Sequence, residues 1–417
     1  MRDSNAKVWI FDAQVKEKVA GALDRLGDAA PSRIVIGEDS GEGVLSWEEV
    51  FAEEGLSFDR SGTMEEAMEE IALVIYTSGT TGRPKGVMLS HSNLYHMVRS
   101  MVEAVEMTEK DRALLILPLF HVNGIMVTLV LPLFVGGSTV ILRRFHPLDF
   151  LAAIRKFRPT YFSAVPTIYG ILLQLPEDAV KNVDFSSLRF GLCGAAPMPK
   201  DLFLRFEERY PVKILEGYGL SEGTVASTFN PLHGKRKIGS IGIPLPGQEV
   251  KIFDEQDREL PPGKIGEIVI RGKNVMVGYL NRPEATGEAL RGGWLRSGDL
   301  GYKDEDGYIH IVDRKKDLII RGGQNIYPAE VENVLYRHPA VFEAAVIGVP
   351  DEKYGEEVKA FVSLKKEYQN RVDEEEIIRF CREHLAYYKT PKSVDFLDEL
   401  PKNSVGKIIK APLRERV

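Results

Sequence analysis

The chain has 417 residues, with 54 Lys and Arg against 61 Asp and Glu and a formal net charge of -7. At roughly 100 to 200 residues per domain, this length predicts two or three domains. Hydrophobic residues make up 44% and charged residues 28%, a globular composition that excludes disorder, collagen and coiled coil. The acidic balance leaves no broad basic field, so we expect no nucleic-acid partner.

Targeting features are weak in this sequence. Two cysteines, Cys193 and Cys381, are too few for a disulfide framework, which indicates a reducing compartment and a cytoplasmic location. The opening residues MRDSNAKVWIFDAQ carry charge where a secretory signal needs an apolar core. The most apolar stretch, 113–137, is broken by two prolines, a histidine, an asparagine and a glycine, so it predicts a buried strand, a loop and a helix rather than a membrane span.

Short β-rich runs alternate with longer helical patterns through the first half of the chain. Strands are predicted at 7–11, 33–36, 71–76, 113–117, 138–142, 161–164, 188–193 and 213–216, and helices at 14–25, 45–54, 147–156 and 200–210. This alternation is typical of βα units and predicts a largely parallel sheet.

The pattern changes at about Gly239, where glycine and proline become dense. Strands at 249–253, 266–271 and 308–312, with a hairpin turn at 304–307, predict a small antiparallel or barrel-like β subdomain. After a charged connector, helices at 328–337 and 373–384 and strands at 344–349 and 358–364 predict an α+β unit. The predicted fold class is therefore α/β: a large N-terminal domain of βα-layered sheets (1–313, with a β-rich subdomain at 239–313), a hinge (314–317) and a small, mobile α+β cap domain (318–417).

The sharpest motif follows the strand at 71–76 and reads Thr77-Ser78-Gly79-Thr80-Thr81-Gly82-Arg83-Pro84-Lys85-Gly86. Its glycines let backbone N–H groups approach an anion, its hydroxyls add donors, and Lys85 adds the positive charge that a triphosphate requires. It is not a Walker A loop, because Gly79 leads to Pro84-Lys85-Gly86. A polar turn after a strand is the alternative, and the density of glycines and hydroxyls favours phosphate binding.

This run resembles the phosphate loop of the adenylate-forming superfamily, which includes acyl-CoA synthetases, aryl-CoA ligases, beetle luciferases and the adenylation domains of peptide synthetases. Five further motifs follow in the family order: Gly194-Ala195-Ala196-Pro197, Glu216-Gly217-Tyr218-Gly219-Leu220-Ser221-Glu222, Gly293-Trp294-Leu295-Arg296-Ser297-Gly298-Asp299, Asp313-Arg314-Lys315-Lys316-Asp317 and Pro401-Lys402-Asn403-Ser404-Val405-Gly406-Lys407. The resemblance implies an acyl-CoA synthetase that uses ATP, Mg²⁺ and CoA on a fatty or aryl carboxylic acid.

The chemistry explains why such motifs are needed. A carboxylate resists attack by a thiol until it carries a good leaving group, and attack on the α-phosphate of ATP supplies one as acyl-AMP. Pyrophosphate then departs with charge that cations must neutralise. The resemblance makes Glu222 the Mg²⁺ ligand and Ser221, where many relatives have Thr, the α-phosphate contact. Lys407 would bridge the carboxylate and the α-phosphate; a solvated loop acid and a basic tail are the alternatives for Glu222 and Lys407.

The nucleoside contacts are also implied by the resemblance. Tyr218, between Gly217 and Gly219, would stack on adenine opposite Gly194, Ala195 and Ala196, with Glu216 near the adenine amino group. Asp299 and Arg314 would hold the ribose and Ile311 would lie against the base. Core packing for Tyr218 and turn capping for Asp299 are the alternatives.

Lys316 is expected at the hinge, with Gly322 and Gly323 lining the pantetheine tunnel after domain rotation. The acyl pocket is expected to involve His121, Gly194 and Gly219, although a satisfied core histidine is an equal alternative for His121. Cys193 is not expected to be a nucleophile, because its strand has a buried pattern.

One departure from the family concerns the beginning of the chain. Only 76 residues precede Thr77, so several βα units of the usual N-terminal portion are expected to be missing. An apolar patch left uncovered would favour self-association, and a homodimer is one arrangement open to the chain. A non-catalytic nucleotide-binding remnant and a luciferase-like oxidase are the alternative functions.

Overall fold

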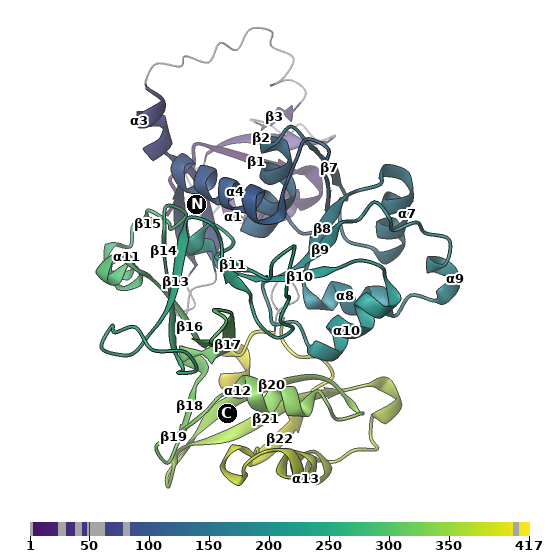
Figure 1. The fold of residues 1–417 in the computed structure, drawn as a ribbon, viewed down its shortest axis with the longest axis vertical. Helices are drawn as coiled ribbons and strands as arrows, with labels where there is room; N and C mark the ends of the chain where they lie inside the picture. The colour runs from purple at the N-terminus through teal and green to yellow at the C-terminus, as the bar shows by residue number, and fades with distance from the viewer. Residues whose placement is uncertain are drawn as a thin grey trace.

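A computed structural model of the chain describes residues 3–23, 31–37, 44–47, 50, 63–77, 84–402 and 408–417. Figure 1 shows a large body of sheets and helices above a smaller unit built from the C-terminal elements, and the last residues return to the region between the two. The prediction of an α/β fold with a large N-terminal and a small C-terminal part is confirmed.

The first sheet is parallel and contains β1 (Val8–Asp12), β2 (Ser32–Ile36) and β3 (Val44–Ser46). Phe11 and Val35 pack with Val19 of helix α1 (Lys16–Leu23) on one face. The helix predicted at 45–54 is wrong at its start, because Leu45 pairs with Ile34 of β2. Pairing with a neighbouring strand outweighed the local helical pattern there; most of that range lies outside the described residues.

The phosphate-loop motif joins two antiparallel strands, β4 (Ile71–Thr77) and β5 (Lys85–Ser90). The βα unit expected here is therefore wrong: a parallel partner needs a crossover of a dozen or more residues, and the connection is shorter than that. Strand β15 (Gly278–Tyr279) completes this sheet on the other side of β5. Helices α3 (Met64–Glu69) and α4 (His91–Val105) flank it.

The largest sheet has the strand order β12-β11-β10-β9-β8-β6-β7, and its five strands from β10 to β7 are parallel, as predicted. Separate hydrophobic clusters cover its two faces. The strands are β6 (Arg112–Leu115), β7 (Ser138–Ile141), β8 (Tyr161–Ala164), β9 (Phe190–Cys193), β10 (Ile214–Tyr218), β11 (Thr228–Phe229) and β12 (Ile243–Pro244).

The helices of this layer follow the strands along the chain. They are α5 (Val122–Ile125), a π-helical segment (Met126–Val130), α6 (Leu131–Phe134), α7 (Pro147–Phe157), α8 (Pro166–Leu173), α9 (Glu177–Val180) and α10 (Lys200–Arg209). The apolar stretch at 113–137 is thus a strand, a loop and a helical segment, as predicted, and the helical segment is π-helical in its middle. Among the described residues, no helix combines the length and apolar character that crossing a membrane requires.

The β-rich region forms an antiparallel sheet of order β13-β14-β16-β17. Its strands are β13 (Gln248–Phe253), β14 (Gly266–Gly272), β16 (Leu295–Lys303) and β17 (Ile309–Arg314), and α11 (Pro283–Ala289) precedes β16. The predicted antiparallel pairing is confirmed, and the sheet is open in the order of its described strands. Asp299 lies inside β16, next to a β-bulge.

A 3-10 turn at Lys315–Asp317 leads into the small unit. Its hydrophobic core includes Ile319, Val331 and Val346, which come from three different elements. The elements are β18 (Ile319–Arg321), β19 (Gln324–Ile326), α12 (Pro328–Leu335), β20 (Val341–Asp351), β21 (Gly355–Leu364), α13 (Glu374–His384), β22 (Ser393–Phe396) and α14 (Ala411–Arg414).

Candidate active site

The carboxyl ends of β9 and β10 meet at one edge of the large sheet, because the two strands are parallel and Cys193 is in register with Glu216. This places the turn of Gly194, Ala195 and Ala196 beside Glu216 and Tyr218. Ala195 has a φ of 66°, so the turn exposes backbone at the sheet edge. Ligands of α/β proteins bind at such an edge.

Glu216 is a buried carboxyl group at this edge. Its Oε1 accepts a hydrogen bond from the Met198 N–H at 3.1 Å, which ties β10 to the segment after Ala196. Its Oε2 is buried without a partner among the described residues. Burial raises the pKa of Glu216 to about 7, and the Met198 N–H acts in the opposite direction. The unpartnered oxygen can therefore accept a hydrogen bond, or donate one when protonated, if a polar group is placed against it.

Tyr218 and Asp299 are 81 residues apart in sequence and in direct contact. The Tyr218 hydroxyl donates to Asp299 Oδ2 at 2.7 Å, and Arg314 Nε lies 3.3 Å from Asp299 Oδ1. Asp299 and Arg314 face each other across β16 and β17, with Ile311 on the same strand as Arg314. Tyr218 belongs to the hydrophobic core as well. Tyr218 therefore packs in the core and also orients the Asp299 carboxylate. None of the described contacts of Asp299 caps the turn before Tyr302.

The turn that carries Ser221 and Glu222 is shaped by its neighbours. A Cβ on Gly219 would lie 2.1 Å from the carbonyl oxygen of Val225, so only glycine fits where the chain folds back. Thr224 then adopts a φ of 55°, and its hydroxyl donates to the carbonyl of Asn274 at 2.6 Å. The side-chain amide of Asn274 donates to the Gly223 carbonyl at 3.0 Å. Contacts from the loop that follows β14 therefore hold the Ser221–Gly223 turn in place.

Lys85 and Glu222 approach the same side chain. The Tyr279 hydroxyl donates to Glu222 Oε1 at 2.8 Å, and Lys85 Nζ lies 4.9 Å from the centroid of the Tyr279 ring. Thr77, at the end of β4, donates its hydroxyl to the Lys85 carbonyl at 3.5 Å. Ser78, Gly79, Thr80, Thr81, Gly82 and Lys407 lie outside the described residues.

His121 stands at the start of α5, where it makes no side-chain cap. Its Nε2 is buried with no partner in the described part of the chain, as is Oδ1 of Asn123. Burial lowers the pKa of His121, so the ring is neutral at neutral pH. The unpaired nitrogen does not match the alternative of a satisfied core histidine. Cys193 is buried, and burial raises its pKa, which agrees with the prediction that it is no nucleophile.

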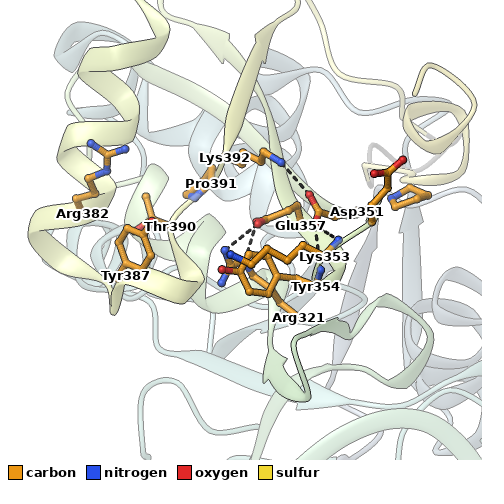
Figure 2. A pocket seen from close by; sticks show the side chains of 12 residues that line it. Arg321, Asp351, Lys353, Tyr354, Glu357, Arg382, Tyr387, Thr390, Pro391 and Lys392 are labelled. Atoms are coloured by element: carbon orange, nitrogen blue, oxygen red, sulfur yellow. Dashed lines mark hydrogen bonds and ion pairs between the residues drawn. The ribbon is translucent and has the colours of Figure 1, made fainter.

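The small unit contains a pocket with a volume of about 700 Å³. Figure 2 shows Tyr387, Thr390 and Arg382 on one side and Tyr354 and Arg321 on the other. Arg321 pairs with Glu357 at 2.7 Å and lies 4.1 Å from the Tyr354 ring centroid. The hydroxyl oxygen of Thr390 is buried without a described partner. Aromatic faces, cations and an unsatisfied hydroxyl thus converge on one hollow.

A pair of glycines follows Arg321, one of the residues that line this pocket. Gly322 and Gly323, with φ values of 56° and 81°, form the two-residue turn between β18 and β19. The Gly322 N–H donates to the Tyr354 carbonyl at 2.8 Å. Lys316, in the 3-10 turn before β18, is exposed, and its neighbour Asp317 pairs with Arg414 at 2.6 Å. The C-terminal helix is therefore anchored next to the connector.

Comparisons with known proteins identify the family of this chain. A family profile described as "AMP-binding enzyme" matches residues 1–280, and one described as "AMP-binding enzyme C-terminal domain" matches residues 330–407. The chain belongs to the AMP-binding enzyme family. A long-chain-fatty-acid–CoA ligase of Bacillus subtilis is 46% identical over 83% of this chain and 62% of its own length. A feruloyl-CoA synthase of an Amycolatopsis species is 44% identical over 84% of this chain and 70% of its own.

Solved structures of AMP-binding enzymes have the same fold. ATP-bound MatB from Rhodopseudomonas palustris matches with a TM-score of 0.88 and 35% identity, over 100% of this chain and 80% of that one. O-succinylbenzoate CoA synthetase from Bacillus subtilis, in complex with ATP and magnesium ion, matches with a TM-score of 0.84 and 34% identity over the same shares. The chain thus spans less than two thirds of the fatty-acid ligase that it matches and four fifths of these structures.

The donor set of this AMP-binding enzyme suits a metal that arrives with nucleotide. No group of three or more metal-binding side chains exists among the residues that the structure describes. Glu222 offers a carboxylate whose Oε2 accepts no hydrogen bond from a described residue. Mg²⁺ binds through one or two carboxylates, waters and substrate phosphates, so a single carboxylate beside a phosphate loop fits it.

Three contributors escaped sequence reasoning: Tyr279, Asn274 and Thr390. Tyr279 and Asn274 act on the Ser221–Gly223 turn from more than 45 residues away, with separations of 57 and 50 residues. Their sequence neighbourhood, a short β-rich stretch with a glycine before the tyrosine, resembles ordinary strand sequence. The pairing of β15 with β5, which the sequence does not signal, brings Tyr279 to this place.

Proposed function

We propose that this protein is an ATP-dependent acyl-CoA synthetase. The carboxylate oxygen of an acid attacks the α-phosphorus of ATP, the bond to pyrophosphate breaks, and acyl-AMP forms. The thiol sulfur of CoA then attacks the acyl carbon, loses its proton, and AMP leaves with the bonding electrons. The names of the similar ligases and synthases support this reaction class, and the acid itself, fatty or aryl, belongs to the proposal.

One observation supports the first half-reaction most directly. The carboxyl edge of the large sheet carries Glu216, with its unpartnered oxygen, and Tyr218, which holds the Asp299 carboxylate of the neighbouring antiparallel sheet; after the next turn, Glu222 and Lys85 both contact Tyr279. In this proposal, these groups meet the base, the ribose hydroxyls and the phosphates in that order. A carboxylate can accept hydrogen bonds from both vicinal hydroxyls, while Lys85 neutralises phosphate charge. Magnesium, when bound through Glu222, supplies charge neutralisation for the departing pyrophosphate.

The pocket of the small unit supports CoA as the acceptor. Tyr354 and Tyr387 present aromatic faces, and the exposed fraction of Tyr387 is 80%. Lys353 and Arg382 form no ion pair with the described residues, so they can hold phosphate groups. An adenine nucleotide has both a base that can stack on the tyrosine rings and phosphates that can pair with the cations. The glycine turn at Gly322 offers a narrow path for the pantetheine arm. This use of the pocket requires that the cap domain, 318–417, rotates about 314–317 with Lys316 at the hinge.

Two half-reaction assays test the proposal. Pyrophosphate release is measured over a panel of carboxylic acids with ATP, and CoA-dependent thioester is measured in the same mixtures. A Lys407→Ala variant should lose adenylation and still convert supplied acyl-AMP to thioester, because that lysine is proposed to act only on the carboxylate and the α-phosphate. The absence of thioester with every acid, in wild-type protein that binds ATP, would support a nucleotide-binding remnant instead.

The cell compartment belongs to the proposal too. Both cysteines, Cys193 and Cys381, are free and buried. Free thiols and ATP-dependent chemistry suit the cytoplasm.

A further inference from the structure

Tyr279 contacts both ionic side chains at the phosphate end of the site. Its hydroxyl donates to Glu222 Oε1 at 2.8 Å. Its ring lies under Lys85, with Nζ 4.9 Å from the ring centroid. Since the three residues come from β15, a 3-10 turn and β5, no single segment of sequence produces this arrangement.

The backbone around Tyr279 is held more firmly than the groups it touches. Tyr279 is in register with Val87 of β5, and the Leu280 N–H donates to the Gly86 carbonyl at 2.8 Å. The Tyr279 N–H donates to Thr286 Oγ1 of α11 at 2.9 Å. The ring itself packs against the large hydrophobic core. Strand pairing, the hydrogen bond to Thr286 and core packing therefore fix the position of Tyr279 next to Lys85.

Glu222, in contrast, has one side-chain contact in the described structure. Its backbone carbonyl accepts from the Met276 N–H at 2.8 Å, but its carboxylate is oriented only by the Tyr279 hydroxyl. The turn that carries it ends in Thr224 and Val225, with φ values of 55° and 98°, a conformation unfavourable for a β-branched residue. A long flexible carboxylate on such a turn needs an external partner to keep one rotamer.

We propose that Tyr279 is a positioning residue for the metal–nucleotide complex. Its hydroxyl occupies Oε1 of Glu222 and leaves Oε2 to hold a metal ion, and its ring face holds the Lys85 ammonium group until nucleotide binds. This inference rests on the proposed function, since it assigns a partner to the carboxylate that would bind Mg²⁺. Groups that orient metal ligands commonly change metal affinity by about 10- to 100-fold when removed.

Metal binding tests the hydroxyl without turnover. Mn²⁺ serves as the probe, and its binding is titrated by electron paramagnetic resonance in the presence of α,β-methylene-ATP. Tyr279→Phe keeps the ring and removes the hydroxyl; we expect the dissociation constant for Mn²⁺ to rise about tenfold or more. Tyr308→Phe is the matched control, because it removes a hydroxyl that donates to the Lys235 carbonyl, away from this site. The control should bind Mn²⁺ as the wild type does.

A double-mutant cycle separates positioning from general damage. In a Glu222→Gln background, Tyr279→Phe should change Mn²⁺ affinity by less than about twofold, because the carboxylate that it orients is gone. Tyr279→Leu also removes the ring face, so it should weaken ATP binding in EDTA, where Tyr279→Phe should not.

The outcomes are distinct. Wild-type affinity for Mn²⁺ in Tyr279→Phe, or an undiminished effect of that change in the Glu222→Gln background, would overturn the positioning role while leaving the proposed function intact. Equal ATP affinity of the Phe and Leu variants in EDTA would overturn the role of the ring. Failure of the wild type to bind ATP at all would overturn the proposed function, and this inference with it.

Discussion

Replacing Asp299 by Asn tests the ribose assignment most directly. The change keeps the shape of the side chain and one acceptor oxygen, and it removes the negative charge. Asp299 sits between the Tyr218 hydroxyl at 2.7 Å and Arg314 Nε at 3.3 Å, with 12% of its side chain exposed. Each carboxylate oxygen still has a lone pair for a ribose hydroxyl. Hydrogen bonds to a charged acceptor contribute about 1.5–3 kcal/mol, so ATP affinity should fall about 10- to 150-fold.

The same change should have little effect on folding. The Arg314 side chain is 46% exposed, so solvent screens its ion pair with Asp299 and the loss should be under about 1 kcal/mol. The Tyr218 hydroxyl keeps an acceptor in the Asn side chain. Asp306→Asn is the control, because Asp306 pairs with Lys237 at 2.7 Å in the same β-rich region and lies away from the sheet edge. Its ATP affinity should match the wild type.

Calorimetry with two nucleotides makes this test specific. ATP and 2′,3′-dideoxy-ATP are titrated into the wild type, Asp299→Asn and Asp306→Asn. We expect the wild type to prefer ATP strongly and Asp299→Asn to lose most of that preference. If Asp299→Asn weakened both nucleotides by the same factor, the ribose assignment would be refuted, and Asp299 would act only through Tyr218 and Arg314.

Three further variants test other parts of the structure. The pKa of Glu216 is about 7 in the folded state against an ordinary value of 4.5, so the folded state holds a proton that the unfolded state releases. The free energy of unfolding should therefore fall as pH rises from about 4.5 to 7, by about 3 kcal/mol at most. Glu216→Gln should abolish this pH dependence in urea unfolding, and an unchanged pH dependence would contradict the prediction. Gly219→Ala places a Cβ 2.1 Å from the Val225 carbonyl oxygen and should abolish ATP binding. Gly170→Ala is the control, because a Cβ at this helical position would meet no neighbouring atom within 4 Å. In thermal melts, the control should be neutral or stabilise the protein by up to about 1 kcal/mol. Thr390→Val should leave adenylation and stability intact, since the Thr390 hydroxyl has no described partner. The same change should raise the KM for CoA several-fold. An unchanged KM would refute the proposal that CoA binds in that pocket.

The candidate site residues could be selected from sequence because the chemistry that suggests them is local. Glu222, Asp299 and Lys85 occur in short motifs whose residue types match phosphate, ribose and metal chemistry. The parallel core of the large sheet was also predictable, since strands and helices alternate along the chain. The direction of β4 and β5 was not: the same glycine-rich run can link a strand to a helix or to another strand, and local pattern does not distinguish them.

The sequence by itself determined which groups the protein can use: a glycine- and threonine-rich loop, an acid after a Gly-Tyr-Gly turn, and a buried pattern for five parallel strands. Only the tertiary structure decided which of them meet. Tyr218 reaches Asp299 across 81 residues and Tyr279 reaches Glu222 across 57. Such contacts depend on strand pairing and core packing between distant segments, and neither leaves a periodic signal in the residues that take part.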